Sequence, residues 1–180
     1  MDLVLLEPSS LMPEQDNHQR RLFSRRARNA LLTAHITISV GLLGDSAGFL
    51  AVAIGAARAG SAAVMVEMVR VLKMFAWTFG VPLSFGALLS GLTLGLGTRW
   101  GVFRYPWVTT KLLLIVSVIL VGALIIGPAL AATLQRAVDT TARLIAAAAY
   151  DVLALAVATT LSVFKPGKPF RSGADAPAAI

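Results

Sequence analysis

Four long apolar runs restrict the fold of this chain more than any other feature of its sequence. They cover residues 30–57, 74–96, 112–134 and 144–164. Each run is long enough to cross about 30 Å of hydrocarbon as a helix of about 20 residues. Because lipid does not tolerate unpaired backbone groups, each run must be helical. The sequence therefore predicts an all-α integral membrane protein, a four-helix bundle within residues 30–164.

The composition agrees with this fold class. Of 180 residues, 57% are hydrophobic and only 14% are charged, unlike an ordinary soluble domain. The absence of cysteine excludes disulfides, thiolate nucleophiles and cysteine-ligated metal centres. The formal net charge is +7, but the basic residues flank the apolar runs instead of forming one basic domain. We expect a lipid bilayer as partner and no nucleic acid.

Basic residues indicate the orientation in the membrane. Most of them precede the first run, lie between the second and third, or follow the fourth. By the positive-inside rule, both termini are then cytoplasmic. Aromatic residues are expected to anchor the helix ends, with Trp100, Tyr105 and Trp107 at the cytoplasmic interface and Trp77 near the outer one.

The two ends of the chain are expected to be disordered and cytoplasmic. The leader, residues 1–29, is rich in acids, prolines and polar residues, and the tail, residues 165–180, is rich in Pro, Gly and Ala. A cleaved signal peptide is the alternative for the first run. The run is too long, contains Asp45 and follows a long leader, so cleavage is not expected.

Two aspartates, Asp45 and Asp151, lie inside the apolar runs, where an ionisable group is costly. Each shares a helix face with small or hydroxyl residues, which are Thr37, Gly41, Gly44 and Gly48 in the first run and Ala147, Ala154, Ala158 and Ser162 in the fourth. Small residues let helices approach closely, so both carboxyls should point into the bundle. Asp45 is expected near the bilayer centre and Asp151 roughly 10 Å below the outer surface. Gly91 and Gly95 show the same packing pattern.

The aspartates have two equally weighted interpretations. In the structural one, each neutral carboxyl clamps a neighbouring helix through Thr78, Ser84, Ser90 or Tyr150, or Asp151 pairs with Lys73 or Arg143. In the functional one, they bind a proton or cation in transit. Pro82 and Pro128 are predicted to kink their helices and to free the carbonyls of Thr78 and Leu124. A small polar cavity open to the outside would satisfy these groups together.

His35 invites a haem interpretation, but a bis-histidine site needs a second histidine on a facing helix. The only other histidine, His18, lies in the leader. His35 is also about 15 Å along the helix from Asp45, too far for a direct pair. We expect it to form a hydrogen bond between helices near the cytoplasmic side, and a proton relay is the alternative role that places His35 with Asp45 and Asp151 in a candidate intramembrane polar site. No catalytic constellation or metal cluster is recognisable, so we expect no cofactor, no metal and no enzymatic activity.

Several short motifs resemble a known family. They lie at residues 33–44, 81–83, 90–92, 96–104 and 158–166. With Trp107 and Lys111, they resemble the actinobacterial four-span membrane proteins classed as domain of unknown function family 2269. The resemblance implies a bacterial plasma membrane and no particular activity. Such relatives tend to carry a tryptophan where Leu42 or Leu43 stands and a histidine early in the last span, where this chain has Tyr150 and Asp151.

Three functional hypotheses follow. The first is a non-enzymatic structural or accessory membrane subunit, which binds a second copy or another membrane protein through small-residue grooves. The alternative is a small proton- or cation-coupled transporter that uses Asp45. A cytochrome-like electron carrier is the third, and the histidine count argues against it.

Overall fold

A computed structural model describes residues 24–97, 105–132 and 137–164. The predicted all-α membrane bundle is confirmed, because four helices are long and apolar enough to cross a membrane. They are Arg25–Ala57, Ala62–Gly97, Pro106–Ala132 and Thr140–Phe164. The described ranges contain no strand. Residues 1–23 of the leader, the tail from residue 165 and Trp100 lie outside the described residues.

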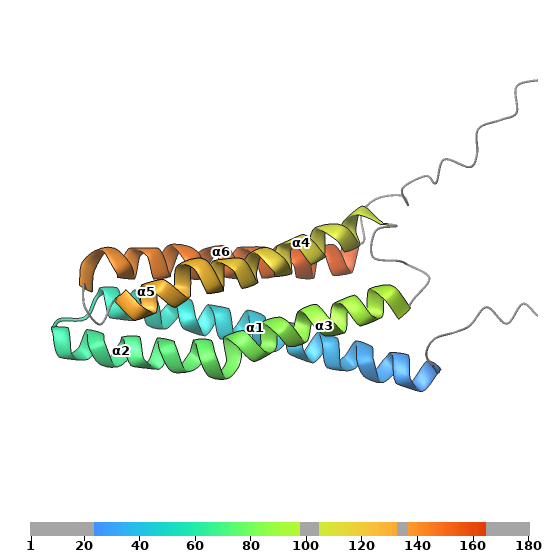
Figure 1. The fold of residues 1–180 in the computed structure, drawn as a ribbon, viewed down its shortest axis with the longest axis horizontal. Helices are drawn as coiled ribbons and strands as arrows, with labels where there is room; N and C mark the ends of the chain where they lie inside the picture. The colour runs from blue at the N-terminus through green and yellow to red at the C-terminus, as the bar shows by residue number, and fades with distance from the viewer. Residues whose placement is uncertain (1–23, 98–104, 133–136, 165–180) are drawn as a thin grey trace, which may run out of the picture.

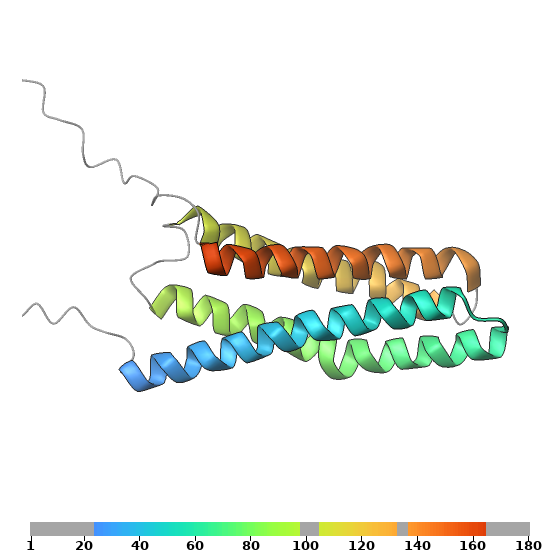
Figure 2. The same ribbon diagram turned by 180° about the vertical axis from the view of Figure 1, so that it is seen from behind.

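The four spans divide into eight helical elements. They are α1 (Arg25–Ala57), α2 (Ala62–Phe75), η2 (Ala76–Gly80), α3 (Val81–Gly97), α4 (Pro106–Val121), η3 (Gly122–Ile126), α5 (Gly127–Ala132) and α6 (Ala137–Phe164). The η elements are single π-helical turns. Successive spans run antiparallel, so α1 begins and α6 ends at the same end of the bundle (Figures 1 and 2). We call this the terminal end, and the opposite end, with the turn at residues 58–61, the hairpin end.

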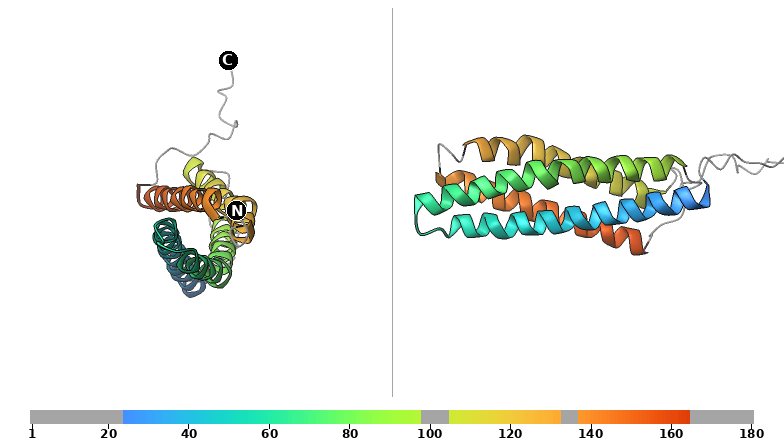
Figure 3. Two further views of the ribbon diagram at one scale, coloured as in Figure 1. Left: turned by 90° about the vertical axis from the view of Figure 1, so that its left-hand side faces the viewer. Right: turned by 90° about the horizontal axis from the view of Figure 1, so that it is seen from below.

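The spans form a ring in which each contacts two others. Neighbours are α1 with α2 and α3, α3 with α4, α4 and α5 with α6, and α6 with α1. The end-on view in Figure 3 shows this arrangement. The contact between α1 and α6, the first and last helices, closes the bundle.

All four spans begin earlier than their apolar runs. Helix α1 starts at Arg25, where the Ser24 hydroxyl accepts a 3.2 Å hydrogen bond from the Ala27 N–H. Residues 25–29 are therefore helical, which corrects the prediction that they belong to a disordered leader. Ser61 caps α2 in the same way, through the Val64 N–H at 3.3 Å. Hydropathy marks only the lipid-soluble part of a helix, whereas a capping residue marks where it begins.

The buried side chains form two separate apolar clusters. The hairpin-end cluster consists of Phe49, Ala53, Val69, Leu72, Ile126, Ala129, Leu130, Leu144, Ala147 and Ala148. The terminal-end cluster consists of Leu42, Ala87, Val118, Ala154 and Leu155. Many large apolar side chains face outward instead, including Trp77, Leu124 and Phe164. That distribution is expected where the solvent is lipid.

Candidate functional site

A polar layer lies between the two apolar clusters. On α1, Asp45 and Ser46 fall between Leu42 of the terminal-end cluster and Phe49 of the hairpin-end cluster. On α6, Asp151 falls between Ala148 and Ala154, which belong to opposite clusters. Because each aspartate is about one helical turn from both clusters, the two lie at the same level of the bundle. We call Asp45, Ser46, Gly80 and Asp151 the mid-bundle layer.

Both carboxyls of this layer are poorly satisfied. The Oδ1 atoms of Asp45 and Asp151 are buried, and neither has a hydrogen-bond partner within the described residues. The Asp151 side chain is only 7% exposed. A buried polar atom without a partner costs about 1–3 kcal/mol. Such a cost in a stable fold calls for a ligand, a proton or a water molecule at these atoms.

Within the described residues, neither aspartate forms the predicted clamp through Thr78, Ser84, Ser90 or Tyr150. The Ser84 hydroxyl donates to the Val81 carbonyl of its own helix at 2.9 Å. Ser90 donates in the same way to the Gly86 carbonyl at 2.6 Å. The Tyr150 hydroxyl lies 2.7 Å from the Ser117 hydroxyl, on α4.

No ion pair satisfies the carboxyls either. Among the described residues, Asp151 forms no ion pair with Lys73 or Arg143. The one ion pair in this part of the chain joins Arg70 to Glu67 at 3.3 Å, on the exposed face of α2. The hydroxyls of Ser84, Ser90 and Tyr150 are thus engaged with other partners.

Gly80 gives the Asp45 carboxyl its space. A Cβ atom added at Gly80 would lie 3.3 Å from Asp45 Oδ2, which is tighter than most such contacts. The carboxyl therefore packs directly on the backbone of η2. Any larger side chain at position 80 would displace it.

Both prolines are preceded by a π-helical turn, so the predicted interruptions are confirmed. The Val81 N–H donates to the Ala76 carbonyl, five residues earlier, immediately before Pro82. The Gly127 N–H donates to the Gly122 carbonyl in the same way, immediately before Pro128. A proline has no N–H, and a π turn absorbs the resulting break in the hydrogen-bond ladder. Both turns lie between the levels of the two apolar clusters or at the edge of one, so the two irregular segments flank the mid-bundle layer.

His35 forms the predicted hydrogen bond between helices. Its Nδ1 atom lies 2.8 Å from the Ser90 hydroxyl oxygen. Since the Ser90 hydroxyl donates its hydrogen to Gly86, its oxygen accepts from the Nδ1–H of the imidazole. The ring also packs against Gly91, where a Cβ atom would lie 3.0 Å from Cε1. His35 thus joins α1 to α3 at the terminal end.

The predicted packing glycines behave differently from one another. A Cβ at Gly41 would contact Leu83 at 3.7 Å, and one at Gly48 would contact Phe75 at 3.5 Å. Gly95 is buried in α3. Packing within the chain is not found at Gly44, because nothing described lies within 4 Å of its Cβ position. Gly44 faces outward on α1.

The aromatic residues predicted as anchors lie at different positions along their spans. Tyr105 and Trp107 lie at the start of α4, with ring centroids 6.5 Å apart, and the Lys111 ammonium lies 5.8 Å from the Trp107 ring. Trp77 lies in η2, about 22 Å from the start of α2 at Ala62. The helix of Trp77 starts 12 residues before the apolar run at Met74, and the role of Trp77 as an anchor near the outer interface stays a prediction.

Asp151 lies close to the middle of its helix. Helix α6 begins at Ala137 and ends at Phe164, which places Asp151 about 21 Å from the start of the helix. The start of a helix does not mark the bilayer surface, so the depth of roughly 10 Å below the outer surface stays a prediction. Asp151 shares the level of Asp45 in the bundle.

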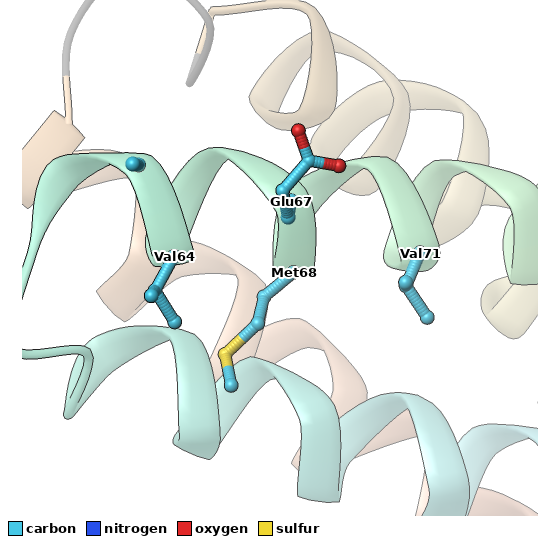
Figure 4. A pocket seen from close by; sticks show the side chains of 5 residues that line it. Val64, Glu67, Met68 and Val71 are labelled. Carbon is cyan, nitrogen blue, oxygen red and sulfur yellow. The ribbon is translucent and has the colours of Figure 1, made fainter.

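Two surface grooves accompany this layer, and neither is lined by a carboxyl of the layer. One, of about 380 Å³, lies on α2 beside Val64, Met68 and Val71. Figure 4 shows that Met68 points from α2 toward the neighbouring helix, whereas Glu67 projects the other way. The second groove, of about 230 Å³, is named here the Pro128 groove. Its lining residues are Leu124, Ile125, Pro128, Ala129, Ala132, Thr140 and Arg143. The predicted cavity around the carboxyls is thus not formed by either groove.

Some members of the site had only weak signals in the sequence. Ser46 is buried beside Asp45, and no spacing rule distinguishes it from an outward serine. Gly80 is one of 15 glycines, and only the approach of α1 gives it a role. The Lys111 ammonium donates to Ser162 on α6 at 2.6 Å, across 51 residues of sequence. The sequence did contain a signal for η2 and η3, because each π-helical turn is followed directly by an X-Pro pair.

Comparisons with known proteins add no further constraint. No protein-family model, no curated protein sequence and no solved structure matches this chain. The resemblance to the actinobacterial four-span family therefore stays a prediction. The chain has the fold of a multi-pass membrane protein, with four helices long and apolar enough to span a membrane.

Proposed function

We propose that this protein carries protons or small cations across the membrane, with Asp45 and Asp151 as the groups that bind and release them. One observation carries the proposal: the two aspartates in the middle of the bundle each have a buried Oδ1 atom without a hydrogen-bond partner in the described residues. Intramembrane acids that lack a structural partner mark ion pathways and proton relays. We further propose that the protein is not an enzyme.

The surroundings of the carboxyls support this role. The Asp45 carboxyl packs on Gly80 at a π-helical turn, and π turns in membrane helices frequently lie at functional sites. The larger hairpin-end cluster covers the layer on one side and the terminal-end cluster covers it on the other. A carboxyl held between two apolar layers is separated from bulk water at both ends, as an alternating-access site requires.

The test is a flux measurement in reconstituted vesicles. Under an imposed pH gradient, vesicles with the wild-type protein should show dye-reported proton flux above that of empty vesicles. Asp45→Asn keeps the size of the side chain but cannot release a proton, so its flux should fall to the level of empty vesicles.

Two further variants make this result specific. Glu67→Gln removes an exposed acid of α2 and should leave flux unchanged. Gly80→Val keeps the acid but pushes the carboxyl away, so it should reduce flux strongly. Unchanged flux in Asp45→Asn, with folded protein verified by size-exclusion chromatography, would remove the proposal; so would a wild-type flux equal to that of empty vesicles.

A second candidate is the accessory membrane subunit. The observation that favours it is the outward face of α1, where Gly41, Gly44, Ala47 and Ala51 are exposed and Gly44 has no neighbour within 4 Å. Small residues on a lipid-facing surface permit close approach of another helix. Because the chain has no cysteine, Gly44→Cys supplies a unique crosslinking point. Failure to crosslink any companion or second copy in native membranes would argue against this candidate.

We also propose that the terminal end faces the cytoplasm of a bacterial cell. The excess of Lys and Arg on the side of the termini supports the orientation, and the family resemblance supports the bacterial plasma membrane. A cysteine placed at Gly60 should react with an impermeant maleimide added to intact cells, and one placed at Ser24 should not. The reverse pattern would invert the orientation.

A further inference from the structure

The Pro128 groove has the composition of a site for an amphipathic anion. Leu124, Ile125 and Pro128 are exposed and form the apolar wall of the groove. Helix α6 contributes Arg143 to its lining. Its volume of about 230 Å³ is below the roughly 300 Å³ at which pockets for drug-sized ligands begin. A slender chain fits such a groove, and a bulky ring system does not.

The position of Arg143 along α6 matches the level of lipid headgroups. Arg143 and Phe164 are about 32 Å apart along the helix axis, close to the roughly 30 Å thickness of bilayer hydrocarbon. Arg143 thus lies at the hairpin-end surface of the bilayer, whereas Leu124 lies deeper. From the level of Arg143, the apolar wall extends about one helical turn toward the membrane interior, from Pro128 to Leu124.

Arg143 pairs with no carboxylate among the side chains that the structure describes. Its side chain is exposed. A guanidinium binds phosphate through two parallel hydrogen bonds, which a Lys ammonium does not provide.

We propose that the Pro128 groove binds an anionic phospholipid, with the phosphate on Arg143 and one acyl chain against Leu124, Ile125 and Pro128. The occupant is a lipid and not a free anion, because most of the named lining residues are apolar. This site is independent of the mid-bundle layer and of ion flux. If the groove binds no lipid, the proposal of ion flux is not affected. If the protein carries no ion flux, the proposal of a lipid site is not affected.

The test is native mass spectrometry of the protein with phosphatidylglycerol, and separately with phosphatidylcholine. The wild type should retain phosphatidylglycerol preferentially, and Arg143→Gln should weaken this binding about ten-fold. Ala132→Leu leaves the charge in place but fills the groove, so it should also weaken binding. Arg58→Gln is the matched control, an exposed arginine at the same end of the bundle, and should bind as the wild type does.

Three results would overturn the proposal. In the first, Arg143→Gln retains as much phosphatidylglycerol as the wild type. In the second, Arg58→Gln loses as much as Arg143→Gln, which would indicate a diffuse charge effect. In the third, inorganic phosphate alone displaces the lipid at millimolar concentration and Ala132→Leu has no effect, which would indicate a free-anion site.

Discussion

Replacing Asp151 by alanine is expected to raise the free energy of unfolding by about 1–2 kcal/mol. The carboxyl is 7% exposed and its Oδ1 atom has no partner in the described residues, so the fold carries the cost of burying it. Alanine also continues the small-residue face formed by Ala147 and Ala154, which keeps α6 close to α1. The measurement is unfolding by sodium dodecyl sulfate in mixed micelles, followed by circular dichroism.

The controls of this experiment separate a functional acid from a structural one. Asp151→Asn retains a polar group that also needs partners, so it should gain little stability. A gain in stability together with a loss of proton flux in Asp151→Ala is the trade-off expected of a functional group held in an unfavourable place. If Asp151→Ala instead destabilises the bundle by more than about 1 kcal/mol, the carboxyl is a structural clamp.

Replacing Leu72 by alanine is expected to lower the free energy of unfolding by about 2–3 kcal/mol. Leu72 is 0% exposed and lies in the hairpin-end cluster. In a membrane, moving leucine from lipid to protein gains no hydrophobic free energy, so the loss comes from the cavity and the lost van der Waals contacts. The expected value therefore lies toward the lower part of the range for buried Leu→Ala changes in soluble proteins.

Leu124→Ala is the matched comparison for Leu72→Ala. Leu124 lies in η3, which continues α4, and its side chain is 69% exposed. Replacing it by alanine should therefore change the free energy of unfolding by less than about 0.5 kcal/mol. A similar loss in both variants would mean that the described packing of the hairpin-end cluster is wrong. An unchanged free energy of unfolding in Leu72→Ala would also contradict the described packing.

The contrast among the glycines of α1 illustrates how far spacing rules reach. Gly44 and Gly48 are one helical turn apart, and the sequence assigns them to the same packing face. Gly48 lies against Phe75, whereas Gly44 has no neighbour. A face of a helix covers a wide angle, and which part of it is buried depends on where the adjacent helices lie. That choice is made by packing between distant segments and not by α1 alone.

The hydroxyls that were expected to clamp the aspartates also show a limit of prediction from sequence. Ser84 and Ser90 have carbonyls of their own helix within reach, and they bond to these instead. Local acceptors of this kind are always available to a serine in a helix. The sequence shows which donors exist, but competition between local and distant acceptors decides which bonds form.

The sequence by itself determined the four membrane helices, their antiparallel order and the presence of two acids within them. These follow from hydropathy and length, because the cost of unpaired backbone in lipid leaves an apolar run no other regular structure. Only the tertiary structure decided that the two acids share one level, that Gly80 receives the Asp45 carboxyl, and that no described side chain bonds to the Oδ1 atom of either acid. These depend on the axial offset between helices far apart in sequence, which no local pattern specifies.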